Sequence, residues 1–402
     1  MAQYFTERLQ KVFHMIFKSY NQEMAQEGLR QLELIVNNQH SPEQPNHRAL
    51  RNDMTTSLEN EIDTKEDALK IANDPEAREI ADAYALLARI YAGPRFTWEE
   101  SNFPENNMRT YQCLHDSIRR CSPIGTLQAL RINGTITPTV EKDMLISFDD
   151  AFRIVYDYAE QGDAFCQYII GNVFFWRDDD RISLARDMIT PPRLSLAKRI
   201  QQSFQKGSIQ ERLIALQGTV SNETLQDNAT KLAKEWFNKA LDNGLAMFQG
   251  NLRNIYIDEG DFNNARRVAL TAAELGNPTM MLYTGLDCHE NGKFEDAFTW
   301  FTKGAALGQA ESTAELADYY YHFYDAKELR RVIPYDPVKA IGLYRRAATK
   351  YFSDAGYAAL QAAFGYIFHI GHLPLDWGLI ADLTHMAATK ERFMFSLPYI
   401  GY

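Results

Sequence analysis

The clearest hydrophobic pattern in the chain is a segment that recurs in the middle of the sequence. Three stretches begin with alanine and reach a glycine eleven positions later, with apolar residues at helical spacing between them. These stretches are Ala233–Gly244, Ala265–Gly276 and Ala297–Gly308, and their starts lie 32 residues apart. Self-similarity at such a fixed period indicates repeated helical units rather than a single globular core.

The boundaries of one unit can be predicted from its residues. Asn277 followed by Pro278 predicts a helix start, since asparagine caps a helix and proline fits its first turn. Gly292 predicts a turn with positive φ at the end of that helix. A second helix is then expected from about Phe294 to Leu307, and Gly308 ends it.

Small and large side chains within the unit predict how the units pack. Ala297 and Ala305 are expected where two helices approach closely, while Trp300 and Phe301 fill the layer between units. One helix pair cannot bury its apolar faces, but stacked pairs can. The predicted fold is therefore all-α, a right-handed helical-repeat solenoid of stacked antiparallel helix pairs.

The same spacing continues on both sides of the three clear copies. Ala151–Gly162 repeats the alanine-to-glycine interval, and Gly171 follows nine residues later, as Gly285 follows Gly276. The stretch DPVKAIGLYRRAATK carries alanine and tyrosine at equivalent places but lacks the closing glycine. Residues 67–91 are expected to form a further helix pair, although they match the repeat pattern less well.

These motifs resemble the Sel-one-like repeat, a short relative of the tetratricopeptide repeat. AFCQYIIGNVFF is similar to the first helix of that family's pattern, and AFTWFTKGAALG to the second. The clean units are shorter than usual for the family, so a tetratricopeptide-like description fits nearly as well. The resemblance implies a protein-interaction scaffold or adaptor that binds a partner protein or peptide, and in bacteria sometimes a factor acting on a host cell.

The pattern divides the chain into four segments. Residues 1–48 form an N-terminal helical cap and linker, and residues 49–145 a helical region that we interpret as divergent repeats. Residues 146–356 carry the repeats, with insertions near 177–228 and 325–336. Residues 357–402 form a C-terminal helical cap.

The N-terminal segment has an apolar stripe at helical spacing. Its residues are Phe5, Leu9, Val12, Phe13, Ile16, Phe17 and Tyr20. Such a helix either packs on the first repeat as a cap, as terminal units of an array require, or binds a membrane surface or a partner. We expect this helix to pack on the first repeat as a cap.

Charge and cysteine content indicate which partners and which cellular compartment to expect. The 402 residues carry a formal net charge of -11, which argues against a dedicated nucleic-acid binder, since such binding depends on neutralising phosphates. The four cysteines form no Cys-x-x-Cys pair, which suits a reducing compartment. The N-terminus shows no signal peptide and no membrane span, so a cytoplasmic location is expected.

Searching for catalytic motifs gives no positive match. Glycine-rich phosphate loops, dinucleotide-binding fingerprints and nucleophile elbows are all missing from the sequence. Asp178, Asp179 and Asp180 could bind a metal, but we expect an exposed loop cluster. The predictions are therefore no metal, no cofactor and no enzymatic activity. The alternative is an enzyme with an unrecognised active site in the N-terminal region or the longer insertion.

The most specific candidate for a binding surface lies beside the shorter insertion. Six consecutive aromatic or imidazole side chains, YYYHFY, cannot all face one core on a helix, and tyrosine is favoured at interface hot spots. The predicted partner-binding residues are Tyr320, Tyr321, Tyr324, Arg330 and Arg331. The alternative is that the inserted segment folds back and buries these rings.

Overall fold

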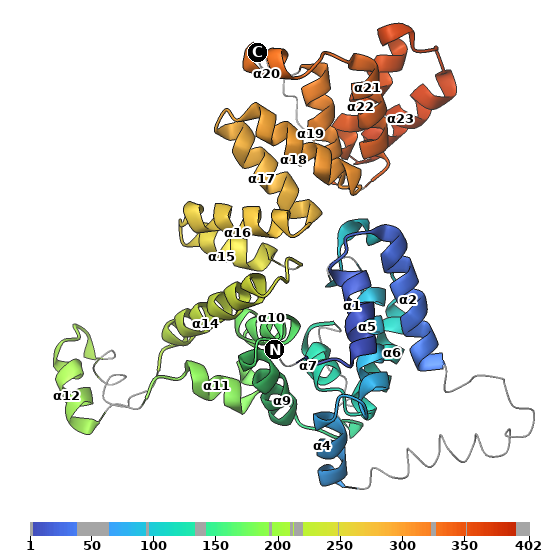
Figure 1. The fold of residues 1–402 in the computed structure, drawn as a ribbon. Coiled ribbons are helices and arrows are strands. Elements are labelled where there is room, and N and C mark those ends of the chain that lie inside the picture. Colours follow the sequence, from blue (N-terminus) through green and yellow to red (C-terminus); the bar gives the residue numbers. More distant parts are fainter. Residues whose placement is uncertain are drawn as a thin grey trace, which may run out of the picture. The chain divides into compact units, whose positions relative to one another are not determined.

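The computed structural model describes residues 3–37, 64–93, 96–132, 142–192, 195–209, 212, 220–247, 249–322, 327–350 and 352–390. All regular secondary structure within these residues is helical, and many helices pack on the next helix along the chain (Figure 1). The prediction of an all-α repeat solenoid of stacked helix pairs is therefore confirmed, while its handedness remains a prediction.

Packing divides the chain into two compact units. Unit 1 comprises Met1–Lys18, Glu23–Thr97 and Phe103–Ile255, and unit 2 comprises Ser19–Gln22, Trp98–Asn102 and Tyr256–Tyr402. This division differs from the four segments that the repeat spacing suggests, and those segments remain a prediction.

Unit 1 contains the first helices of the chain. They are α1 Glu7–Phe17, α2 Gln22–Asn37, α4 Lys65–Asn73, α5 Glu79–Tyr91, α6 Asn107–Arg119, α7 Pro123–Ile132, α9 Phe148–Glu160, α10 Ala164–Phe175, α11 Ser183–Ile189, α12 Leu196–Phe204, α14 Asn222–Asp242 and the start of α15 Gly250–Asp258. A 3₁₀ turn, η4, covers Asp178–Asp180. Helix α10 packs on both α9 and α14, and α7 packs on α5 and α9.

Unit 2 contains the later helices of the chain. Its helices are α16 Phe262–Glu274, α17 Pro278–Glu290, α18 Phe294–Ala306, α19 Ala310–Tyr321, α20 Lys327–Val332, α21 Pro337–Ala348, α22 Ala355–Ile367 and α23 Trp377–Lys390. The 3₁₀ turns η3 Glu99–Ser101 and η5 Ile370–His372 also belong to it. From α16 to α19, each helix packs on the next one along the chain, and α21, α22 and α23 continue the series.

The boundaries predicted for one repeat unit are confirmed. Asn277 caps α17 by accepting a hydrogen bond from the Met280 N–H, and Pro278 occupies the first turn. Gly292 has a φ of 72° and precedes α18, which begins at Phe294. The glycines that close the alanine-to-glycine segments share this left-handed conformation, with φ values of 96°, 80°, 101° and 93° at Gly162, Gly244, Gly276 and Gly308. The recurring glycine is therefore a requirement of the turn after the helix.

A second glycine of the motif allows two helices to approach closely. A Cβ atom on Gly285 would lie 2.5 Å from the Phe301 ring, and one on Gly171 would lie 2.6 Å from the Phe237 ring. Phe237 and Phe301 are 1 % and 0 % exposed, so neither ring has room to move away. The same glycine-on-phenylalanine contact therefore joins a helix pair in each unit, α10 with α14 and α17 with α18.

The N-terminal apolar stripe is buried, while its role as a cap of the array stays a prediction. All of its residues, from Phe5 to Tyr20, are less than 9 % exposed. On α10, the ring of Phe165 lies 5.8 Å from Phe5 and 4.8 Å from Phe13, measured between ring centroids. Helix α1 therefore packs on the array within unit 1.

A buried ion pair fixes the N-terminal segment to three helices of unit 1. Arg78 and Asp82 are 0 % and 1 % exposed, and the Arg78 Nε donates to an Asp82 carboxylate oxygen over 3.0 Å. Arg78 also donates to the Tyr4 carbonyl over 2.7 Å. The hydroxyls of Tyr4 and Ser122 donate to Asp82, and the Tyr4 N–H donates to Asp163, the N-cap of α10. One polar network thus joins α5, the start of α7 and the start of α10.

Replacing glycine by alanine should change the free energy of unfolding in opposite directions at Gly285 and at Gly342. Gly285→Ala should lower the free energy of unfolding of unit 2 by about 1–3 kcal/mol, because the new methyl group overlaps a ring that cannot move. Gly342→Ala in α21 should raise it by about 0.4–1 kcal/mol, because no atom lies within 4 Å of the added Cβ. Urea-induced unfolding measures both. Equal effects at the two positions would show that the close approach is not required.

Breaking the buried ion pair should destabilise unit 1 strongly. Arg78→Met leaves the Asp82 carboxylate buried without its cation, so we expect a loss of about 3–5 kcal/mol in urea-induced unfolding. The matched control is Arg153→Met, since Arg153 pairs with Asp150 at the surface and is 57 % exposed. That change should stay within about 1 kcal/mol. A loss of similar size for both variants would contradict the role given to Arg78.

Candidate binding cavity in unit 1

Unit 1 contains a cavity of about 470 Å³, a size typical of ligand sites. Helices α5, α7 and α10 form most of its wall, and the beginning of α15 completes it. The lining residues are Arg89, Phe96, Leu127, Gln128, Arg131, Tyr168, Ile169, Asn172, Val173, Trp176, Asp178, Gly250 and Asn251. The wall is therefore largely apolar and aromatic, with a small number of polar side chains.

Helical spacing explains how α10 supplies one side of the cavity. Tyr168, Asn172 and Trp176 are four residues apart, as are Ile169 and Val173, so all five lie on one face. The helix is buried from Phe165 to Phe174, which means that even its polar residues lie inside the protein. Asp163 caps the helix by accepting a hydrogen bond from the Cys166 N–H.

Two buried amide side chains that line the cavity have polar atoms without a hydrogen-bond partner among the described residues. Gln128 is 3 % exposed and Asn172 is 9 % exposed. Within the part of the chain that the structure describes, neither the Nε2 nor the Oε1 atom of Gln128 has a partner, and the Oδ1 atom of Asn172 has none either. An unpaired buried polar group destabilises a protein by about 1–3 kcal/mol, so such groups point to a bound molecule that would satisfy them.

Arg89 brings a permanent charge to the wall of the cavity. This residue of α5 is 3 % exposed, and its guanidinium carbon lies 5.5–5.8 Å from the ring centroids of Phe96, Phe165 and Tyr168. Contacts with ring faces stabilise a desolvated cation. The three rings therefore hold the Arg89 guanidinium in place.

An ion pair lies beside the indole of Trp176. The Arg131 guanidinium donates to both carboxylate oxygens of Asp178, with 2.9 Å between its Nε and Oδ2, and its carbon lies 5.6 Å from the Trp176 ring. Burial raises the pKa of Asp178 to about 6, although Arg131 acts in the opposite direction. Because both oxygens accept from Arg131, the carboxylate is held as a structural partner rather than presented as a free base.

The expectation that Asp178, Asp179 and Asp180 form an exposed loop cluster is wrong for the first two. Asp178 and Asp179 are 5 % and 1 % exposed. Asp179 accepts hydrogen bonds from Arg177 and Arg186 over 2.7 and 2.6 Å. Burial acts to raise the pKa of Asp179, but these two arginines hold it below its usual value. Nearby cations neutralise the cluster, and so its first two members can be buried.

The described residues contain no group of three or more histidine, cysteine, aspartate or glutamate side chains placed to hold a metal ion. In the same ranges, no helix is both long and apolar enough to cross a membrane.

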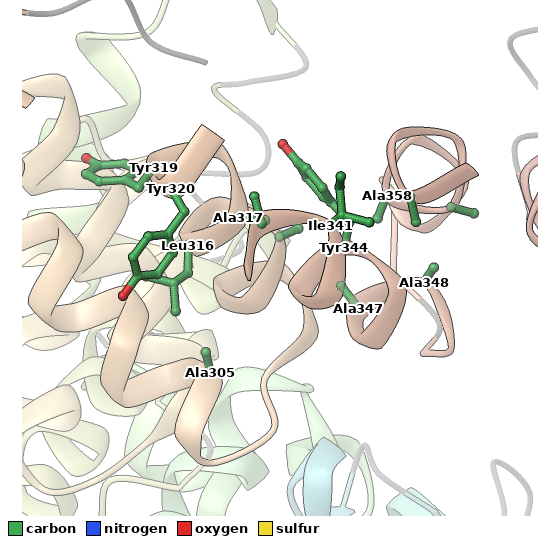
Figure 2. Close-up of a cluster of buried hydrophobic side chains, with 14 of the residues drawn as sticks. Ala305, Leu316, Ala317, Tyr319, Tyr320, Ile341, Tyr344, Ala347, Ala348 and Ala358 are labelled. Atoms are coloured by element: carbon green, nitrogen blue, oxygen red, sulfur yellow. The ribbon is translucent and has the colours of Figure 1, made fainter. Parts of the chain in front are cut away.

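The residues predicted from the sequence to bind a partner lie elsewhere, in unit 2. Tyr320 is 9 % exposed and belongs to the hydrophobic cluster of α19, α21 and α22, part of which Figure 2 shows. Its hydroxyl accepts a hydrogen bond from the Lys339 Nζ over 2.7 Å. Tyr321 is half-buried, 6.2 Å from the Tyr335 ring centroid, whereas Arg330 and Arg331 on α20 are exposed. Tyr324 lies outside the described residues.

The inserted segment covers part of the aromatic run, which is the alternative that the sequence left open. Ile333 from this segment is 1 % exposed and belongs to the same cluster as Tyr319 and Tyr320. The Asp336 N–H donates to the Tyr320 carbonyl over 2.9 Å. Whether the remaining rings and arginines contact a partner stays a prediction.

Sequence reasoning missed the cavity, although a signal for it exists. Arg89, Gln128 and Asn172 each interrupt an otherwise apolar helical stretch, in ALLARIY, IGTLQAL and YIIGNVFF. A single polar residue on a buried helix face needs a partner inside the protein or in a bound molecule. The sequence alone cannot show that these three stretches surround one cavity.

Comparisons with known proteins return structures of the repeat type. No protein-family model matches the chain, and no curated protein matches it. A Sel1 repeat protein from Oxalobacter formigenes is similar, with 15% identity over 95% of this chain and 82% of that chain, at a TM-score of 0.40. A protective antigen of uropathogenic Escherichia coli that displays an SLR fold is similar at 15% identity, covering 96% of this chain and 84% of that chain, with a TM-score of 0.35.

Both of these solved structures carry repeats of the type that the sequence motifs resemble.

Proposed function

We propose that this chain is a non-catalytic scaffold that binds a partner polypeptide, and that one side chain of the partner enters the cavity of unit 1. The observation that carries the proposal is that, among the described residues, the Gln128 amide and the Asn172 Oδ1 atom lack partners in the wall of a largely apolar and aromatic cavity. Anchor side chains at protein interfaces typically fill such desolvated pockets.

The chemistry of the lining favours binding over catalysis. Among the described lining residues, Asp178 is the one carboxylate, and Arg131 occupies both of its oxygens. A guanidinium held against a carboxylate stabilises its charged form and so makes it a weaker base. The raised pKa of Asp178 is what most favours the alternative of an enzyme, and its ion pair with Arg131 argues against that alternative.

Charge supports a polypeptide partner rather than a nucleic acid. The chain carries a net charge of -11, and a strong nucleic-acid site would have to overcome this charge locally with several cations. The two arginines that line the cavity contact aromatic rings or an aspartate. Stacked helix pairs also provide the extended surfaces on which repeat proteins hold peptides and helices.

Filling the cavity tests the proposal. Peptides are first selected from a random displayed library against the full chain, and their affinities are then measured by fluorescence anisotropy. Val173→Trp should weaken the binding of selected peptides by at least about 10-fold, because the indole occupies the space of the anchor. Ile169→Phe is a milder filling variant in case the larger one does not fold.

The matched control is Lys231→Trp, which places the same side chain at an exposed position of α14. Its affinity should stay within about 2-fold of the parent chain, and thermal unfolding should show both variants folded. If the filled variants bind selected peptides as tightly as the parent chain does, the cavity is not the anchor site and the proposal fails.

We also propose a second binding surface, around α20, which the sequence pattern predicts. The exposed Arg330 and Arg331 on α20 lie close in sequence to the half-buried Tyr321, and they could hold an acidic partner segment. If Tyr321 is a hot spot, Tyr321→Ala should weaken binding of a selected peptide by at least about 1 kcal/mol. Tyr320→Ala is a poor test, since this ring packs in the core and its loss affects stability. Unchanged affinity of a folded Tyr321→Ala chain would exclude this surface for that peptide.

A further inference from the structure

The polar atoms of the cavity specify what kind of group can enter it. We propose, resting on the function proposed above, that the cavity recognises a carboxamide, the side-chain group of asparagine or glutamine in the partner polypeptide. A bound group must match the hydrogen-bond donors and acceptors of the wall that lack partners among the described residues.

The unpartnered atoms of the wall match a primary amide. Gln128 offers the two N–H donors of Nε2 and one acceptor, Oε1, and Asn172 offers a second acceptor, Oδ1. A primary amide has two N–H donors and a carbonyl oxygen that accepts two hydrogen bonds. Its N–H groups can therefore pair with the two acceptors while its carbonyl accepts from Gln128. Gln128 presents an NH2 donor group and a carbonyl acceptor whichever way its amide is turned.

A carboxylate fits this wall less well than an amide. It has no proton to donate, so it would leave the acceptor oxygens of Gln128 and Asn172 buried without a partner. The Asp178 carboxylate lines the same cavity and would repel it. Of the two arginines, Arg131 is already engaged by Asp178, while Arg89 is held among three aromatic rings.

A cation or a purely apolar group fits still less well. A cationic side chain would meet the charges of Arg89 and Arg131 in the same wall. An apolar side chain would leave all three unpartnered polar atoms unsatisfied. The apolar part of the wall, with Ile169, Val173 and Trp176, suits the carbon stem that carries the amide.

The test uses two nearly isosteric small molecules, 3-phenylpropanamide and 3-phenylpropanoate, with the full chain at pH 7. Dissociation constants come from saturation-transfer NMR. We expect the amide to bind at least about 10-fold more tightly than the carboxylate, the factor expected when buried polar atoms are paired rather than left unpaired. In Gln128→Met the preference should fall to about 2-fold or less, because the Nε2 donor group and the Oε1 acceptor are lost.

The possible outcomes separate this inference from the function on which it rests. Tighter binding of the carboxylate, or an amide preference that survives in folded Gln128→Met, overturns the carboxamide assignment and leaves the cavity as a binding site. If neither compound binds, or if both bind Val173→Trp as they bind the parent chain, the cavity itself is not the site. The comparison in the parent chain needs no variant, so it decides the assignment even if Gln128→Met does not fold.

Discussion

The structure of unit 1 depends on a buried ion pair. Arg78 and Asp82 lie in the interior, and with Tyr4, Ser122 and Asp163 they connect the N-terminal segment to α5, α7 and α10. These are the three helices that form most of the cavity wall. Charges can be buried here because hydrogen bonds satisfy them, and a network of this kind fixes one arrangement of the helices around it. The position of Gln128 relative to Asn172 follows from that arrangement.

The repeat can be predicted because its boundaries depend on residues that are close together in the sequence. The asparagine cap, the proline that follows it and the glycine of the turn act within a few residues, so the sequence is enough to assign the roles of Asn277, Pro278 and Gly292. The close-approach glycines Gly171 and Gly285 are visible as a spacing, but their partners are not. Phe237 and Phe301 lie on the next helix of the array, and the contact exists only once the helices pair.

The cavity and the burial of the acidic cluster could not be predicted in the same way. Asp178 is buried because Arg131, which comes 47 positions earlier in the chain, reaches it from α7. The sequence shows arginines beside the cluster, but it does not show which distant helix covers it. Gln128, Asn172 and Arg89 are likewise recognisable as polar interruptions of apolar helices, whereas their meeting around one space is a property of the fold.

In our proposal, Gln128 and Asn172 of unit 1 form a recognition site for a partner side chain. The most direct measurement is a crystal structure of the full chain with a peptide selected against it. We predict that an asparagine or glutamine side chain of the peptide lies in the cavity, with its carboxamide within about 3.2 Å of the Gln128 amide. A peptide seated elsewhere, with Gln128 and Asn172 still unpaired, would contradict the account.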